Sequence, residues 1–387
     1  MVPNGWENKT LETLCEPTAP ITYGVLKPGD YVDGGTPLLQ IKDLLNDLSD
    51  IDSLHRISPE LDLEYRRSRI ATNDILISLV GTVGRIGLVP EELNGANIHR
   101  NLGRIRTKNY KFLVHYLNSD IAKNKIGLSS SGSSQSALNL SVLRALKVPV
   151  PPLPEQHKIA QILSTWDRGI VITEKLIDAS KQQKKALMQQ LLTGKKRLVD
   201  PETGKAFEGE WEDSTLSNVC KIIKGKQLNR STLNTTGKYP VINGGITPSG
   251  YTDSSNNVRN TITISEGGNS CGYIDYQKAD FWCGGHCYSL SKVTIDTKYL
   301  YQYLKHNEQR VMSLRVGSGL PNIQKKAIES VPVLYPSERE QQKIASVLTA
   351  ADKEIELLEA KLAHFKQEKK ALMQQLLTGK RRVSLSS

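Results

Sequence analysis

The chain has 387 residues, a hydrophobic fraction of 38% and a formal net charge of +11, which predicts at least two globular domains and favours an acidic partner, most simply nucleic acid. No apolar run approaches the roughly 20 residues of a membrane helix, and no secretory leader is evident. Because the five cysteines are an odd number and suit a reducing compartment, we expect a cytoplasmic protein with no membrane partner.

The two halves of the chain open alike. Trp6 and Trp211 each begin a Trp-Glu-x-x-Thr-Leu stretch, and Cys15 and Cys220 follow at equal distances; we expect both cysteines to be buried strand residues. The runs at 74–78 and 261–265 read as short strands that lead into Gly-rich loops. The non-helical regions therefore repeat, although their sequences have diverged.

Later features keep the same order in both halves. Candidate helices lie near 111–118 and 297–305, and small-residue loops follow at 129–136 and 317–319. Asn139 and Asn322 come next, and both are plausible helix N-caps. Each half closes on Val-Pro-Val, at 148–150 and 331–333, and a further proline then breaks the chain before the long helix.

The closest internal match lies at the ends of two expected helices. Residues 184–195 and 369–380 both read KKALMQQLLTGK, and the Glu-Gln-x-Lys-Ile-Ala stretches at 155–160 and 340–345 share the same offset. Two interleaved seven-residue apolar series predict a coiled-coil seam, interrupted in both copies by a lysine, Lys184 or Lys369. The seam residues proposed for partner docking and spacing are Leu163, Ile170, Leu187, Leu191, Leu348, Ile355, Leu372 and Leu376.

The expected fold class is α+β, with two mixed globular domains separated by two long antiparallel coiled-coil helices in an internal pseudo-twofold repeat. We place the first globular domain at 1–151, the first helix at 152–197, the second globular domain at 198–335 and the second helix at 336–387. Since the helices are nearly identical and the globular domains are not, we expect the helices to meet one kind of partner and the globular domains different ones.

Motifs for catalysis are missing from the sequence. There is no Gly-x-x-x-x-Gly-Lys-Ser/Thr phosphate loop, no Asp/Asn-Pro-Pro-aromatic methyltransferase tetrad and no Ser-His-Asp arrangement. Cys271, Cys283, His286 and Cys287 form the one metal-like cluster, but their spacing does not match common zinc ribbons, which favours core or loop roles over zinc. We expect no catalytic residue, metal or cofactor.

Basic and polar side chains near the Gly-rich loops suit DNA better. Glycine allows the backbone to approach a phosphate, and arginine can hydrogen-bond the edge of guanine. Any single one of these residues could instead be a solvated surface residue, and the Ser-rich loop at 127–136 could be a linker. The DNA-binding candidates are Arg85, Arg100, Arg104, Arg106, Ser133, Gln135, Lys224, Lys226, Arg230, Asn269 and Arg315.

Two diverged globular domains, each followed by a near-identical long helix, resemble the specificity subunit of a type I restriction-modification system. The most specific stretches are Pro-x-x-Glu-Gln-x-Lys-Ile-Ala at 152–160 and Lys-Lys-Ala-Leu-Met-Gln-Gln-Leu-Leu-Thr-Gly, found twice. The second helix departs from this pattern at its start, where Ser337 stands in place of the proline, beside Pro336.

The resemblance implies two target-recognition domains, each reading one half of a bipartite site in double-stranded DNA. It implies antiparallel helices that space these domains and dock two methyltransferase subunits, with motor-nuclease subunits joining the complex. The specificity subunit itself would be non-catalytic. The alternatives are a non-enzymatic regulatory or architectural DNA-binding protein and, with least support, a stand-alone nuclease or methyltransferase.

Overall fold

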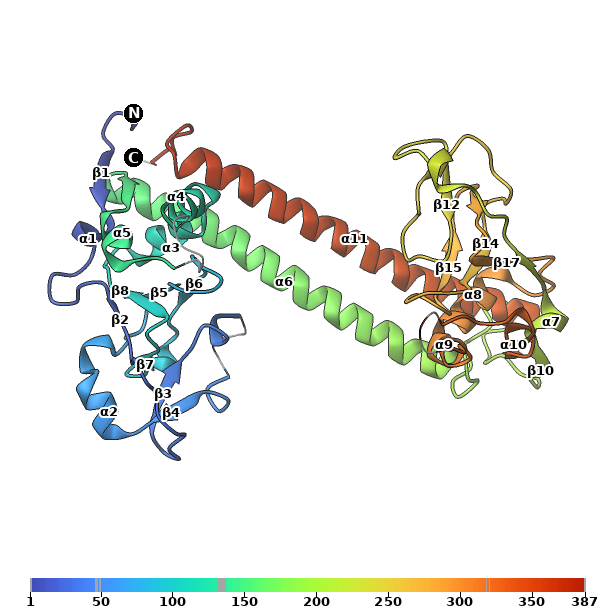
Figure 1. Ribbon diagram of the computed structural model, residues 1–387. Coiled ribbons are helices and arrows are strands. Elements are labelled where there is room, and N and C mark those ends of the chain that lie inside the picture. The colour runs from blue at the N-terminus through green and yellow to red at the C-terminus, as the bar shows by residue number, and fades with distance from the viewer. Residues whose placement is uncertain are drawn as a thin grey trace. The chain divides into compact units, whose positions relative to one another are not determined.

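The computed structural model describes residues 2–45, 48, 50–130, 137–317, 319 and 321–385. The chain forms two compact units: unit 1 comprises Met1–Thr173 and Lys361–Ser387, and unit 2 comprises Glu174–Ala360. Each unit contains one globular domain and one segment of each long helix, α6 (Leu153–Leu191) and α11 (Glu338–Leu376) (Figure 1). No helix among the described residues is both long and apolar enough to cross a membrane.

The first globular domain mixes short strands and helices, as the sequence predicts. Its predicted strand at 74–78 is observed as β5, and its predicted helix at 111–118 as α3. The elements are β1 Glu7–Thr10, α1 Leu11–Leu14, β2 Thr22–Tyr23, β3 Thr36–Leu39, β4 His55–Ile57, α2 Pro59–Glu64, β5 Ile75–Ser78, β6 Ile86–Leu88, β7 Asn97–Ile98, β8 Leu102–Ile105, α3 Tyr110–Asn118, α4 Asp120–Ser130, α5 Leu140–Ala145 and β9 Lys147–Val150.

The second globular domain follows the same plan. The strand expected at 261–265 is β14, and the helix expected at 297–305 is α8. The elements are β10 Glu212–Thr215, α7 Leu216–Val219, β11 Lys221–Lys224, β12 Tyr239–Ile242, β13 Tyr251–Thr252, β14 Thr261–Ser265, β15 Ile274–Gln277, β16 Trp282–Cys283, β17 Cys287–Ser291, α8 Thr297–His306, α9 Glu308–Ser313, α10 Lys325–Glu329 and β18 Pro332–Tyr335.

The two globular domains have the same sheet topology. A four-stranded sheet has the order β2-β8-β5-β6 in the first domain and β11-β17-β14-β15 in the second. A three-stranded sheet (β4-β3-β7, β13-β12-β16) and a two-stranded sheet (β1-β9, β10-β18) also correspond. Hence the weak sequence match between the halves reflects one fold used twice.

A glycine follows β2 and β11 at equivalent places because another backbone passes too close for a side chain. A Cβ on Gly24 would lie 1.6 Å from the carbonyl oxygen of Ile98, and a Cβ on Gly225 would lie 2.1 Å from that of Gly284. Glycine is the residue that permits such an approach. Any other residue would push the two backbones apart.

Some local predictions are wrong. Asn322 is not an N-cap, because α10 begins at Lys325 and is capped by Gln324. Asn139 is the N-cap residue of α5 as predicted, although its side chain accepts no capping hydrogen bond. Cys15 and Cys220 are not strand residues: each is the C-cap of a short helix, where its thiol bonds a carbonyl oxygen four residues earlier.

The first turn of each long helix carries a buried glutamate that binds an arginine from the tail behind the other long helix. In unit 1, Glu155 accepts hydrogen bonds of 2.7 and 2.8 Å from Nε and Nη2 of Arg382. In unit 2, Glu340 accepts bonds of 2.7 and 2.6 Å from the same atoms of Arg197. The helix dipole favours an anion at this end, and the paired geometry strengthens the bonds. Within each unit, the start of one helix therefore lies beside the end of the other.

A second polar contact repeats further along the helices. Lys369 donates to Asp167 in unit 1, and Lys184 donates to Asp352 in unit 2. These lysines are the ones that interrupt the predicted apolar seam. Each ammonium group is thus paired across the helices, which limits the price of placing a charge among apolar neighbours.

The globular domains add a third group to this contact, and here the units differ. In unit 1, Nδ1 of His115 lies 3.6 Å from Oδ2 of Asp167. In unit 2, the equivalent residue is Gln302, whose Nε2 donates to Oδ2 of Asp352 at 2.7 Å. Burial lowers the pKa of His115 to about 4, and Asp167 opposes this shift.

Replacing Arg197 with alanine should lower the free energy of unfolding by about 3 kcal/mol, because the change leaves Glu340, which is 0% exposed, buried without its cation. Urea unfolding measures the difference. The matched control is Lys278→Ala, which breaks a pair with Glu356 in which both side chains are more than half exposed; it should cost less than about 1 kcal/mol. If both variants lost the same free energy of unfolding, Arg197 would contribute no more than an exposed surface charge.

The His115→Gln variant should remove a pH dependence from the stability of unit 1. Between pH 6.5, the ordinary pKa of histidine, and about 4, the unfolded chain binds a proton that folded His115 does not. Stability is therefore lost as the pH falls through this window, by up to about 1.4 kcal/mol per pH unit. Unfolding of both proteins between pH 8 and 4 provides the measurement. If the stability of wild type and of His115→Gln changed with pH in the same way, His115 would not be the source of the pH dependence.

Candidate nucleic-acid interface

A groove of about 850 Å³ on the first globular domain is rich in arginine. It runs beside β2, where exposed Tyr23 and Leu26 contribute an aromatic ring and an apolar side chain. Six guanidinium groups line the groove and a single carboxylate, that of Glu64, accompanies them. The arginines are Arg66, Arg67, Arg69, Arg104, Arg106 and Arg144. Such a basic groove with an aromatic side chain suits a nucleic-acid backbone.

Two predicted arginines of this groove are engaged within the domain. Arg104 is 4% exposed, its guanidinium donates to the carbonyl oxygen of Pro20 at 2.9 Å, and burial lowers its pKa. Arg106 forms two 2.7 Å hydrogen bonds with buried Asp74. Both therefore shape the wall of the groove.

The exposed charges of the groove come from residues that the sequence prediction omitted. Arg66 and Arg67 are exposed in a short 3-10 helix, Arg66–Ser68. Among the described residues, neither forms an ion pair. The three arginines among the four residues 66–69 could have indicated this basic surface from the sequence. They were not predicted because this segment lies outside the Gly-rich loops.

The other first-domain candidates lie apart from one another. Arg85 is half-buried within the Gly-rich loop at 81–87, and its backbone N–H donates to Oγ of Ser78 at 2.8 Å. Arg100 is exposed in the turn before β8. Ser133 and Gln135 lie outside the described residues.

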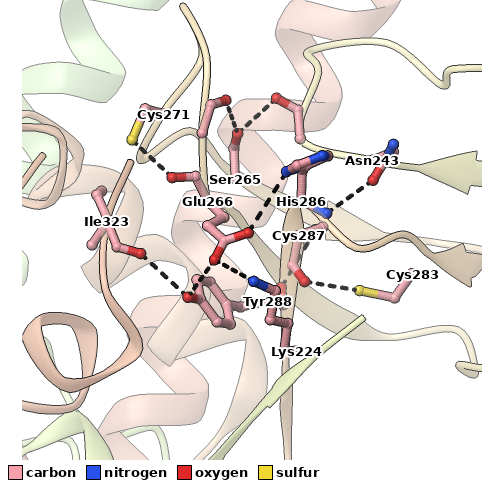
Figure 2. A network of polar contacts seen from close by, with 12 residues as sticks. Lys224, Asn243, Ser265, Glu266, Cys271, Cys283, His286, Cys287, Tyr288 and Ile323 are labelled. Atoms are coloured by element: carbon pink, nitrogen blue, oxygen red, sulfur yellow. Dashed lines mark hydrogen bonds and ion pairs between the residues drawn. The ribbon is translucent and has the colours of Figure 1, made fainter. Parts of the chain in front are cut away.

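The second globular domain has a polar network centred on Glu266, the first residue of its Gly-rich loop (Figure 2). Oε1 of Glu266 accepts hydrogen bonds from Nζ of Lys224 at 2.6 Å and from the hydroxyl of Tyr288 at 2.9 Å. Oε2 lies 3.8 Å from Nδ1 of His286. Lys224 was predicted as a DNA-binding candidate. Glu266 and Tyr288 were not, because the prediction rested on basic, amide and small hydroxyl side chains near the Gly-rich loops.

The remaining second-domain candidates are exposed but are not all in one place. Lys226 follows β11, where its carbonyl oxygen accepts from the Trp282 indole at 2.8 Å. Arg230 begins a 3-10 helix, Arg230–Thr232. Asn269 lies in the Gly-rich loop, and Arg315 is close enough to Cys271 to act electrostatically on the pKa of that thiol.

The cysteines and His286 of the metal-like cluster take separate roles. The thiol of Cys271 bonds the carbonyl oxygen of Glu266, and that of Cys283 bonds the carbonyl oxygen of Cys287 (Figure 2). Within the described part of the chain, no three or more His, Cys, Asp or Glu side chains are grouped to hold a metal ion.

The helix residues proposed for docking lie mainly inside the units. Leu163, Leu191, Leu348, Ile355 and Leu376 are buried. Ile170, Leu187 and Leu372 are half-buried. Each unit's core joins some of these side chains to its globular domain. Those in the cores therefore attach the helices to the domains, and the role of the whole set in docking stays a prediction.

The comparisons with known proteins agree on one family. Residues 3–181 and 208–367 match the type I restriction modification DNA specificity domain. The type I restriction enzyme EcoBI specificity subunit of Escherichia coli is 32% identical over 231 residues, which cover 58% of this chain and 46% of that protein. The chain thus spans about half the length of that relative. The putative MjaX specificity subunit of Methanocaldococcus jannaschii is 28% identical, with coverage of 99% and 95%.

Solved structures share the fold. The S subunit of a type I restriction-modification system from M. genitalium superposes with a TM-score of 0.69 at 17% identity, covering 100% of this chain and 99% of that one. A chain from a study of complex assembly and conformational transition in a type I system has a TM-score of 0.58 at 20% identity, covering 98% and 100%. With two domain matches along its length and the duplicated fold described above, this chain belongs to the family of type I restriction-modification DNA specificity subunits.

Proposed function

We propose that this chain is the non-catalytic subunit that selects the DNA site for a type I restriction-modification complex. Each globular domain reads one half of a bipartite site in double-stranded DNA. One observation carries the proposal: the domains share every sheet order, yet they present different side chains at equivalent positions. A common backbone with different chemistry suits two readers of different half-sites.

The helices are proposed to form one antiparallel coiled coil that sets the distance between the half-sites. The repeated Glu–Arg and Lys–Asp contacts support this arrangement within each unit. In functional terms, we retain residues 1–151 and 198–335 as the readers and 152–197 and 336–387 as the spacer.

Two methyltransferase subunits are proposed to dock on the helices, and motor-nuclease subunits to join them. Because the seam residues are buried or half-buried, we extend the proposed docking surface to exposed apolar side chains of the same helices. These are Val171 (48% exposed) and Ile172 (58%) in unit 1, and Leu176 (49%) and Leu357 (62%) in unit 2. Exposed apolar side chains are where a partner gains most from removing surface from water.

Exchanging the first globular domain, up to about Pro149, for that of a relative should change one half of the recognised sequence and leave the other. Sequencing of methylated sites in cells that also contain the methyltransferase subunits gives the result. The purified chain alone should transfer no methyl group. If both half-sites changed, the domains would not be independent readers. A regulatory or architectural protein would produce no bipartite methylation at all.

Inserting four residues into α6 between Lys175 and Gln182 should lengthen the spacer and leave both half-sites unchanged. The insertion adds about 6 Å and rotates the following segment by about 40°. Since DNA rises about 3.4 Å per base pair, the gap should grow by one or two base pairs. Methylation sites are mapped in a variant that still assembles. An unchanged gap would restrict the helices to docking, and a changed half-site would show that they contact bases.

A further inference from the structure

We propose that Glu266 is a base-reading residue: its carboxylate accepts a hydrogen bond from the exocyclic amino group of an adenine or a cytosine in the half-site read by the second globular domain. This inference rests on the proposed function. It names one contact by which that domain recognises sequence.

The carboxylate is held so that one oxygen is available. Lys224 and Tyr288 both donate to Oε1, at 2.6 and 2.9 Å. Oε2 accepts no hydrogen bond from any described residue, since Nδ1 of His286, at 3.8 Å, is beyond bonding distance. Figure 2 shows these three side chains around the carboxylate. An ionised carboxylate is an acceptor only, and it suits the amino donors of cytosine and adenine.

The surroundings of Glu266 are open to a large ligand. The side chains of Lys224 and His286 are 55% and 66% exposed. Asn269 is exposed in the same loop, and a Cβ on Gly268 would meet no atom within 4 Å. The lysine supplies positive charge that attracts phosphates towards this place.

The first globular domain has different chemistry at the same backbone positions. Leu79 and Glu266 follow equivalent strands, and their N–H groups donate to the carbonyl oxygens of Asn101 and His286, at 2.8 and 2.9 Å. Thus buried Leu79 of the first domain occupies the position of Glu266 in the second domain, and Asn101 occupies that of His286.

The supporting residues differ in the same way. Tyr23 pairs with Gly103 in the first domain where Lys224 pairs with Tyr288 in the second. The first domain therefore forms the same sheet order without this network. The Glu266 side chain is itself 13% exposed, beside a lysine that is 55% exposed. The carboxylate therefore lies at the rim of the domain, between buried Tyr288 and the exposed lysine.

The test compares the wild-type complex with a complex containing Glu266→Gln, both assembled with methyltransferase subunits. After the methylated sequence is mapped, duplexes are prepared in which one amino group of the second-domain half-site is absent: purine replaces an adenine, or 2-pyrimidinone replaces a cytosine. Wild type should lose roughly tenfold or more in affinity at one position. The identity of that base distinguishes adenine from cytosine.

In the Glu266→Gln complex, Lys224 and Tyr288 should hold the amide oxygen in place of Oε1, so that an NH2 donor replaces the acceptor Oε2. This position should then no longer lose affinity when the amino group is removed, while every other position keeps its wild-type response. Glu208→Gln, an exposed change of the same charge in unit 2, is the matched control and should behave as wild type. Glu266→Asp is the second variant. It keeps the negative charge but places the carboxylate one methylene group closer to the backbone, so the loss of affinity on removing the amino group at that same position should become smaller.

The inference is overturned if Glu266→Gln responds to every analogue as wild type does, or if wild type is indifferent to every missing amino group in that half-site. Either result, obtained with wild type still methylating a bipartite site, leaves the proposed function intact. A wild-type complex that methylates no bipartite site would instead remove the proposed function.

Discussion

The buried glutamate at the start of each long helix is the contact on which both units depend. A carboxylate removed from water is expensive unless strong donors surround it. Glu155 and Glu340 obtain those donors from Arg382 and Arg197, which follow the ends of the opposite helices. One ion pair thereby fixes the first turn of one helix, the tail of the other and their relative direction within the unit.

Neighbouring residues make this contact specific. The guanidinium group of Arg382 lies 6.0 Å from the centre of the Trp6 ring, and that of Arg197 lies 6.0 Å from the centre of the Trp211 ring. Trp6 also donates its indole N–H to Glu155 at 3.1 Å. The tryptophans at the openings of the two halves and the Glu-Gln pairs at the helix starts thus belong to the same place in the fold.

Periodicity predicted the long helices well, because a 39-residue helix shows its apolar pattern many times over. The short strands were found where Ile and Thr alternate between turns, as at 261–265. Caps were harder: Asn139 is the N-cap residue of α5, but Asn322 lies two residues before the N-cap residue of α10, because chain geometry decides where a helix begins. The arginines show the limit most clearly. Sequence gives the charge of Arg104 and Arg106, but it does not show that Asp74 and backbone carbonyls already occupy them.

The two units also differ in the order in which their parts leave the ribosome. Unit 2 is one continuous stretch, and 143 positions separate Arg197 from Glu340. Unit 1 is discontinuous, and 227 positions separate Glu155 from Arg382. The ratio is less than a doubling, so the loop-closure entropy differs by less than about 0.6 kcal/mol. The two ion pairs therefore differ more in when they can form than in the free energy of closing their loops. Unit 2 can close during synthesis, whereas the first globular domain must wait, with Glu155 unpaired, until the final helix and its tail have emerged.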